Sequence, residues 1–201
     1  MRTEFSTTSL FDAPTRLTPA GERIAAAAAQ LFYEQGIRAV GVDAVAELAG
    51  TTKKTLYDCF GSKDALVAVY LVRRHRAWSA HLEDEVARHR APRARVLAVF
   101  DAQASWAAGS SRGCAYINAW AEAGTSAPIA AVVRAEKAWM RARFDALVSD
   151  AGIRPPGRVA ATLHLLYEGA LVASTAGGDD RAVADARRAA AQILAAGGSG
   201  S

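Results

Sequence analysis

Cysteine is scarce in this sequence, and long apolar runs are absent. The 201 residues include only two cysteines, Cys59 and Cys114, which fall in separate predicted elements. This indicates a protein of a reducing compartment, although a redox role for either thiol stays open. No apolar stretch reaches the about 18 residues that cross a bilayer. Glu4 and Asp12 mark an N-terminus without the apolar segment of a secretory signal. We therefore predict a cytoplasmic protein without a membrane segment.

Proline and strand-like alternation are also rare. The sequence has 6 prolines, no internal repeat, and an abundance of alanine, the best helix former. Hydrophobic residues make up 51% of the chain, enough for a sizeable core and two sub-domains. The predicted fold class is all-α, with about nine helices.

Residues arranged for catalysis are missing as well. There is no Ser-His-Asp order, no nucleophile elbow and no glycine loop that would cradle a phosphate, so we predict neither an enzyme nor a cofactor. His81, Glu85 and His89 share one helix face, but no fourth ligand is in sight. A solvated face is the preferred interpretation, and no metal site is predicted.

Capping residues and glycines divide the chain into helices. Thr18 precedes a helix over 19–35, and Ser62 precedes a long helix over 63–90. Ser126 is expected to cap a helix over 126–150, and Asp179 or Asp180 the last one. The remaining expected helices are 92–108, 114–122 and 156–176, with the last ending near 195.

Residues 37–64 predict two short helices joined by a tight turn. Val45 and Ala46 form an apolar face, Gly50 suits a left-handed backbone, and Thr51 or Thr52 can cap the second helix. In that second helix Leu56 and Phe60 share one face, whereas its lysines and tyrosine share another. This is a helix-turn-helix pattern, whose outward face suits a major groove. The segment from Arg16 to Arg76 contains nine Lys/Arg and six Asp/Glu, so most of the net charge of +4 lies within residues 16–76.

The order Ala46, Gly50, Leu56-Tyr57, Phe60-Gly-Ser-Lys63 resembles the DNA-binding segment of the tetracycline-repressor (TetR) family. The match is specific over about 16–76 and architectural beyond it. The resemblance implies an N-terminal three-helix DNA-binding domain and a C-terminal domain for ligand binding and dimerisation. It implies a homodimer through the last two helices, a palindromic operator in double-stranded DNA, and repression relieved by an unknown small-molecule effector. Residues carried over as DNA contacts are Thr52, Lys53, Lys54, Thr55, Tyr57 and Lys63.

The segment departs from the family pattern at three places. Gly41 stands where a capping Thr or Ser is common, Thr51 replaces a frequent valine, and Asp58-Cys59 replaces larger residues. Asp58 can accept a hydrogen bond from cytosine N4 or pair locally with Lys54, and the sequence leaves both open.

Ligand chemistry is harder to derive. Polar-tipped and aromatic residues on otherwise apolar helices are pocket candidates, although each singly is more typical of a core. They are Trp106, Tyr116, Asn118, Trp120, Trp139, His164 and Tyr167. His164 and Glu168 lie one turn apart and are expected to pair.

The predicted organisation is a disordered arm over 1–15, the DNA-binding domain over 16–62, and the ligand-binding and dimerisation domain over 63–196. Within it, 63–90 is a linking helix, and 197–201 is a flexible tail. The leading function is a ligand-responsive DNA-binding repressor. The alternatives are a helical small-molecule-binding protein or an interaction adaptor that does not use its helix-turn-helix on DNA.

Overall fold

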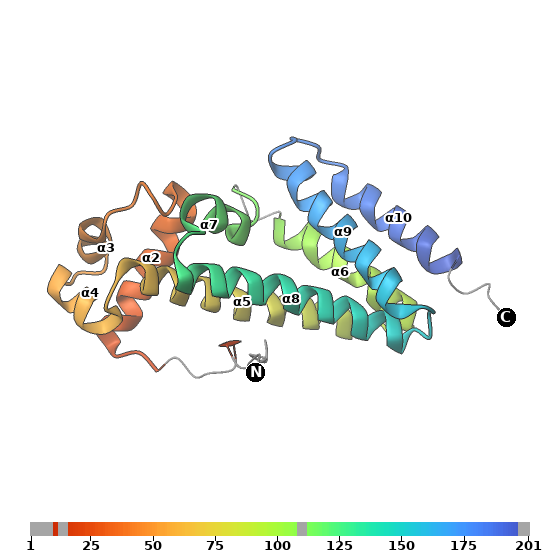
Figure 1. Ribbon diagram of the computed structural model, residues 1–201, viewed down its shortest axis with the longest axis horizontal. Coiled ribbons are helices and arrows are strands. Elements are labelled where there is room, and N and C mark those ends of the chain that lie inside the picture. The colour runs from red at the N-terminus through yellow and green to blue at the C-terminus, as the bar shows by residue number, and fades with distance from the viewer. Residues whose placement is uncertain (1–9, 12–15, 108–111, 197–201) are drawn as a thin grey trace. The chain divides into compact units, whose positions relative to one another are not determined.

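The computed structural model describes residues 10–11, 16–107 and 112–196 (Figure 1). The predicted tail, and the predicted arm apart from residues 10–11, lie outside the described residues. Within the described ranges the chain forms nine helices of seven to 25 residues and no strand, which confirms the all-α fold class. None of these described helices has the length and hydropathy needed to cross a membrane.

The N-terminal helices begin and end close to the predicted residues. They are α2 (Pro19–Gln35), α3 (Val42–Leu48), α4 (Lys53–Phe60) and α5 (Lys63–Ala87). The hydroxyl of Thr18 accepts from the Gly21 amide at 3.1 Å, and that of Ser62 accepts from the Ala65 amide at 3.0 Å. Each hydroxyl satisfies one of the amides that a helix start leaves unpaired, so these side chains fix where α2 and α5 begin.

The later helices are α6 (Pro92–Ala107), α7 (Ala115–Ala123), α8 (Ala127–Asp150), α9 (Pro156–Thr175) and α10 (Ala182–Ala196). Two details of the prediction are wrong. The Ser126 hydroxyl is buried without a hydrogen-bond partner among the described residues, so it does not cap α8. The linking helix α5 ends at Ala87 rather than at residue 90. There the backbone changes to 3₁₀-type hydrogen bonds, in which the Arg88 amide donates to the Glu85 carbonyl three residues earlier, and Pro92 follows.

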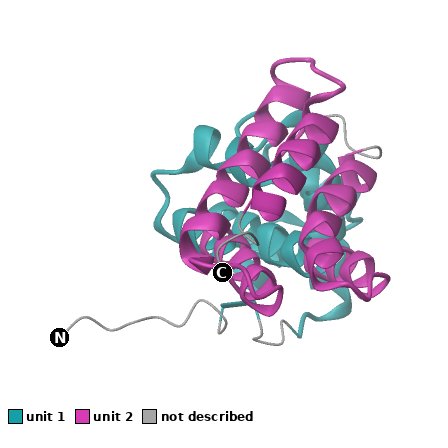
Figure 2. Cartoon of the chain, turned by 90° about the vertical axis from the view of Figure 1, so that its right-hand side faces the viewer, with its two compact units in different colours: residues 1–76, 115–136 teal, residues 77–114, 137–201 magenta. Residues whose placement is uncertain are grey.

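The chain is divided into two compact units (Figure 2). Unit 1 comprises residues 1–76 and 115–136, and unit 2 comprises residues 77–114 and 137–201. Helices α5 and α8 each contribute residues to both units. Unit 1 therefore combines the helix-turn-helix with residues 115–136 from the middle of the chain. The predicted domains, divided at residues 62–63, assign these two segments to different domains.

The core of unit 1 holds the helix-turn-helix in place. Helix α2 packs on both α3 and α4. Ile24 of α2, Val45 of α3 and Leu56 of α4 are completely shielded from solvent. Burying side chains of this size stabilises a fold by about 1.5–3 kcal/mol each. The orientation of α4 therefore depends on apolar packing against the two helices before it.

Helix α7 is joined to the rest of unit 1 by polar contacts. The buried Tyr116 hydroxyl donates to the Leu71 carbonyl of α5 at 3.2 Å. At the other end of α7, the Arg38 amide donates to Glu122 Oε2 at 2.8 Å, and its Nε donates to the Glu122 carbonyl at 2.7 Å. Arg38 lies in the connection between α2 and α3. It thus links the helix-turn-helix to a helix more than eighty residues away in sequence.

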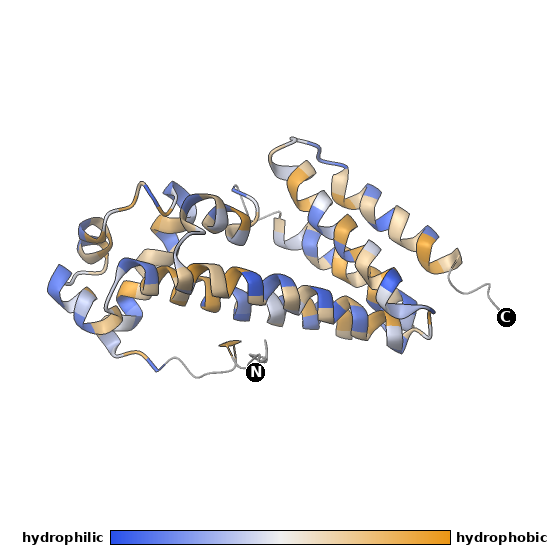
Figure 3. Ribbon diagram, viewed as in Figure 1, coloured by the Kyte–Doolittle hydropathy of each residue, from blue (hydrophilic) through white to orange (hydrophobic). Residues whose placement is uncertain are grey.

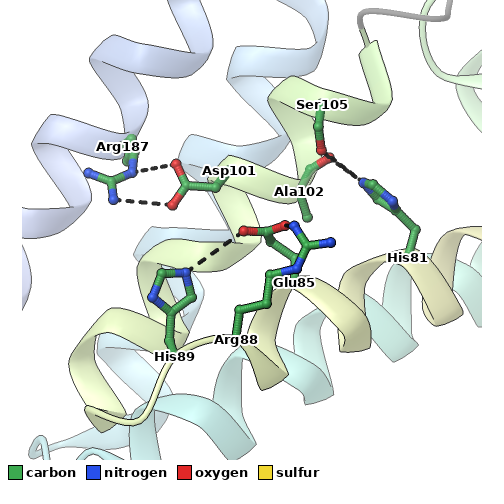
Figure 4. A network of polar contacts seen from close by, with 8 residues as sticks. All are labelled: His81, Glu85, Arg88, His89, Asp101, Ala102, Ser105 and Arg187. Carbon is green, nitrogen blue, oxygen red and sulfur yellow. Dashed lines mark hydrogen bonds and ion pairs between the residues drawn. The ribbon is translucent and has the colours of Figure 1, made fainter.

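Unit 2 has its own hydrophobic core. Phe100 of α6, Phe144 of α8 and Leu163 of α9 are completely buried there. Helix α10 packs on α6 and α9, and Arg187 of α10 holds the Asp101 carboxylate of α6 through two nitrogens at 2.7 and 3.1 Å (Figure 4). This bidentate pair fixes the register of α10 on α6 beyond what small alanine side chains specify.

Candidate nucleic-acid interface

Helix α4 has one buried face and one exposed polar face. Leu56 is fully buried and Phe60 is 9% exposed, so these two side chains anchor the helix. Lys53, Lys54 and Tyr57 are exposed. Figure 3 shows the first residues of α4 as strongly hydrophilic. The helix therefore presents two ammonium groups and a phenol to solvent from a rigid base, which is the arrangement a groove-reading helix requires.

The turn before α4 is fixed by backbone chemistry. Gly50 has φ +59°, a left-handed conformation that glycine adopts without strain. The Arg23 guanidinium donates to the Ala49 carbonyl at 3.1 Å, and the Thr51 amide donates to Ala46 O at 2.9 Å. These bonds pair groups that the end of α3 would otherwise leave unsatisfied. The angle between α3 and α4 is consequently well defined.

Thr52 caps α4, which decides between the two predicted caps, Thr51 and Thr52. Its hydroxyl accepts from the Thr55 amide at 3.1 Å and lies 2.9 Å from the Thr55 hydroxyl. Both threonines were predicted to contact DNA. Their hydroxyls are oriented by each other, at the positively polarised start of the helix, where a phosphate is favoured.

Both lysines at the start of α4 pair with carboxylates of the same unit. Lys53 Nζ lies 3.1 Å from Asp43 Oδ2 on α3, and Lys54 Nζ lies 2.7 Å from Asp58 Oδ2 one turn later. The hydrogen bond to Asp58, followed by its charge, raises the pKa of Lys54 above its ordinary value. Of the two roles left open for Asp58, the local pair with Lys54 is present.

Lys63 differs from these two lysines. It is half-buried at the first residue of α5, and among the described residues it has no ion-pair partner. A positive charge held by a capped helix start and not matched by a carboxylate is well suited to a phosphate oxygen. The candidate interface therefore includes one unpaired and two paired lysines.

The seven pocket candidates divide between the two units. Tyr116, Asn118 and Trp120 lie in unit 1, and Trp106, Trp139, His164 and Tyr167 lie in unit 2. Tyr116 is buried and bonded to α5, whereas Trp120 is 45% exposed, with Arg134 lying 5.3 Å above its ring.

Three candidates of unit 2 join an aromatic group that also includes residues not predicted to line a pocket. Trp106 lies 5.6 Å from the Trp78 ring and 5.3 Å from His81, measured between centroids. Tyr167 lies 5.9 Å from Phe144, which in turn lies 6.2 Å from His164. Helical spacing places Trp78 and Phe144 on apolar stripes, but gives no signal that the stripes of α5 and α8 meet these residues.

A half-buried charge cluster adjoins this aromatic group. Lys137 Nζ donates to both oxygens of Glu168 at 2.9 and 3.0 Å, and His164 Nε2 lies 3.4 Å from the same carboxylate, which confirms the expected pairing. Burial alone would raise the pKa of Glu168, but the contact with His164 and the charge of Lys137 together hold that pKa below its ordinary value. Glu168 is therefore an ionised carboxylate within unit 2.

The histidines and cysteines do not assemble a metal site among the described residues. His81 turns towards α6, where its Nε2 lies 2.9 Å from the Ser105 hydroxyl, whereas His89 lies 3.8 Å from Glu85 (Figure 4). Cys59 and Cys114 are not joined in a disulfide, and Lys137 Nζ donates to the Cys114 sulfur at 3.8 Å.

Comparison with known proteins places these features in context. Residues 24–70 match the model of a family described as bacterial regulatory proteins, tetR family. A TetR-type transcriptional regulator of known structure from Streptomyces avermitilis is 31% identical. The match covers 90% of this chain and 98% of that one, with a TM-score of 0.77.

Two further structures support the comparison. A TetR-family transcriptional regulator from Streptomyces coelicolor is 26% identical over 89% of this chain and 95% of its own, with a TM-score of 0.79. The reduced form of NemR from E. coli is 19% identical over 88% of this chain and 98% of its own, with a TM-score of 0.76, a likeness of fold alone. A search of curated protein sequences found no match.

Proposed function

The chain belongs to the TetR family of bacterial regulatory proteins, and from that premise we propose that it is a cytoplasmic repressor, released from a palindromic operator by a small-molecule effector. The observation that carries the proposal is the exposed face of α4, with Lys53, Lys54 and Tyr57, on a helix anchored by the buried Leu56. In this proposal residues 16–62 read DNA, and residues 63–196 bind the effector and dimerise.

DNA reading is assigned to six residues of the helix-turn-helix and the start of α5. Lys53, Lys54 and Lys63 neutralise phosphates, while Tyr57 presents its ring and hydroxyl to the groove. The hydroxyl pair of Thr52 and Thr55, 2.9 Å apart, adds short polar groups at the helix start. The positive end of the α4 dipole favours the same anionic partner.

The homodimer is assigned to α9 and α10. Leu165 is 72% exposed and Val172 is 51% exposed, although both belong to a helix in which Leu163 and Tyr167 are buried. Residues seven apart lie on the same helix face, so these two side chains form one apolar strip. A second copy of α9 and α10 would cover the strip in a four-helix interface around a two-fold axis.

The effector site is assigned to the aromatic group of unit 2 with its neighbouring Glu168 cluster. This group offers apolar rings and a few fixed polar atoms, the usual composition of a small-molecule site. Gln103 adds a buried amide whose Nε2 donates to the Tyr167 carbonyl at 3.2 Å and whose oxygen has no partner among the described residues. Effector and DNA affinities must be coupled reciprocally: an effector that weakens DNA binding tenfold itself binds tenfold more weakly to the DNA complex.

Lys63→Ala and Tyr57→Phe test the DNA-reading assignment. In a two-fold dimer each lysine acts twice, and each neutralised phosphate contributes about 0.9 to the slope of log affinity against log salt. Lys63→Ala should weaken binding to all sequences and flatten that slope by about 2. Tyr57→Phe should cost about 1 kcal/mol per half-site on the preferred duplex. Fluorescence anisotropy on a duplex selected from a random pool, titrated at several salt concentrations, measures both.

Arg93→Ala serves as the control for this experiment. Arg93 is an exposed cation of α6 in unit 2, so its loss lowers the net charge equally without touching the helix-turn-helix. The repressor proposal fails if the pool yields no preferred duplex, or if Lys53→Ala, Lys54→Ala and Lys63→Ala all leave the salt slope unchanged. A helical ligand-binding or adaptor protein would then be the better description.

A further inference from the structure

Two of the three lysines assigned to DNA already have a negatively charged partner in the protein. Asp43 and Asp58 lie 3.1 and 2.7 Å from Lys53 and Lys54, and all four side chains are at least half exposed. The two pairs come from different parts of the helix-turn-helix, because Asp43 is in the first turn of α3 and Asp58 is on α4 itself. A surface meant only to attract a polyanion would leave these cations unmatched.

Stability is a weak reason for these pairs. Exposed ion pairs contribute a median of about 0–1 kcal/mol. Helix α4 is already fixed by the buried Leu56, by the Thr52 cap and by the turn at Gly50. The effect on a DNA partner is larger, because a paired lysine brings no net charge and releases few counterions when it approaches phosphate.

We propose that Asp58, assisted by Asp43, is a specificity-determining residue that suppresses binding to nonspecific DNA. This rests on the proposed function. On an unrelated sequence, Asp58 and Asp43 hold their lysines away from the phosphates and themselves repel the backbone. On the operator, Lys54 turns to a phosphate, and the released Asp58 carboxylate accepts a hydrogen bond from an exocyclic amine, cytosine N4 or adenine N6, in the major groove.

The two carboxylates have different shares in this discrimination. Asp58 lies one residue after Tyr57 on the exposed side of α4, so it enters the groove together with that helix. Asp43 lies on α3 and acts only as a screen for Lys53. Asp43 also places a negative charge in the first turn of a helix whose N-cap, Gly41, provides no side-chain bond. Asp58→Asn is therefore the cleaner test.

The test compares binding of Asp58→Asn and the unmutated full-length protein to two probes. One probe is the duplex that the unmutated protein enriches from a random pool, and the other is a scrambled duplex of equal length and composition. Freed from Asp58, both copies of Lys54 can neutralise phosphate, so the slope on the scrambled duplex should steepen by about 2. At about 0.15 M salt, affinity for the scrambled duplex should rise at least about tenfold. The ratio of selected to scrambled affinity should fall by a similar factor.

Glu34→Gln is the matched control. Glu34 is an exposed carboxylate of α2 in the same unit, and no lysine is paired with it among the described residues. The change in net charge equals that of Asp58→Asn, so the difference between the two variants isolates the pairing with Lys54. Asp58→Asn in a Lys54→Gln background should gain much less than it gains alone.

Asp43→Asn provides a second variant, with far-UV circular dichroism to verify that α3 is retained. It should raise affinity for the scrambled duplex in the same direction as Asp58→Asn and leave the base preference of the selected duplex unchanged.

Three outcomes overturn the inference. An unchanged scrambled-duplex affinity in Asp58→Asn, with the unmutated protein still preferring its selected duplex, rejects the inference and leaves the proposed function intact. An equal gain in the Lys54→Gln background shows that Asp58 acts without the pair, and rejects it too. Failure to enrich any duplex removes the proposed function itself.

Discussion

Glu168 is a carboxylate on which burial and neighbouring charge act in opposite directions. Its side chain is 22% exposed, so desolvation opposes its negative charge. Lys137 donates to both of its oxygens, and His164 lies 3.4 Å away. The partners prevail, and the pKa lies below the ordinary value of 4.5. A group whose pKa is lowered by folding stabilises the fold above its unfolded pKa, and that stability is lost as pH falls through the folded pKa.

Glu168→Gln should therefore destabilise the protein at neutral pH and have less effect in acid. Replacing the carboxylate leaves the half-buried Lys137 without its counter-charge, which costs about 1–3 kcal/mol. Urea unfolding at pH 7 should show this loss, and the difference should shrink as the pH falls below about 4.5. Asp145→Asn is the control, because its pair with Arg141 is more exposed and should contribute under about 1 kcal/mol. A difference that persists undiminished to pH 3 would contradict the assignment.

Contacts between side chains could be predicted from the sequence where the two partners are close together in the sequence. The Lys54–Asp58 and His164–Glu168 pairs each span four residues, the spacing that places two side chains on one helix face. The Lys137–Glu168 and Arg38–Glu122 contacts span 31 and 84 residues, and helical periodicity carries no information about such distances. Glu168 could be paired with His164 in advance, but not with Lys137, which donates to both of its oxygens.

Helix ends in unit 1 follow local chemistry. Gly41 and Gly50 flank α3, and no neighbouring atom lies within 4 Å of where a Cβ would stand at either position. Gly41 has an extended backbone with φ −79° and ψ 157°, which any residue adopts. Gly50 has φ +59°, where a side chain is strained. The same substitution should thus have opposite effects at the two positions.

Gly41→Ser should stabilise the protein by a few tenths of a kcal/mol, because the serine hydroxyl can accept from an amide of the first turn of α3. Gly50→Ser should destabilise it by about 1 kcal/mol through the left-handed backbone. Thermal and urea unfolding of the two variants, measured side by side, check the sign and the size. If both substitutions moved stability in the same direction, helix capping would not be what distinguishes these glycines.

The predicted capping role of Ser126 failed, although α8 begins directly after it, at Ala127. Ser126 precedes α8 and has the residue type of a cap, yet its hydroxyl is buried without a partner among the described residues. A capping side chain contributes only if it turns back to the amides of the first turn, and the Ser126 hydroxyl makes no such bond within the described ranges. The hydroxyls of Thr18, Thr52 and Ser62 do make this bond, at the starts of α2, α4 and α5.

At the scale of the whole molecule, the apolar strip of α9 allows a test of assembly. Leu165→Glu should raise the dimer dissociation constant at least about 100-fold, because two leucine side chains, each contributing about 1.5–3 kcal/mol when buried, would be replaced by charges. Sedimentation equilibrium at micromolar concentration measures the change. Leu48→Glu is the control, because Leu48 is an exposed leucine of α3 in the other unit.

A stable monomer of the unmutated protein, or equal weakening by both variants, would contradict this assignment of the interface. The family resemblance implied a dimer through the last two helices, but their small side chains pack equally well within one chain. Ala186 and Ala190 illustrate this, because both are buried inside unit 2. The exposed Leu165 and Val172 carry the assignment instead.

The contacts of α7 affect whether the helix-turn-helix domain can be transferred to another regulator. Residues 115–136 pack in the same compact unit as residues 1–76, and the Arg38 and Tyr116 bonds bridge the two stretches. A chimeric regulator that borrowed only the N-terminal stretch would leave the Arg38 guanidinium and the Leu71 carbonyl without these partners. Grafting this domain onto a foreign sensor therefore requires two segments of the donor chain, residues 1–76 and residues 115–136 with α7.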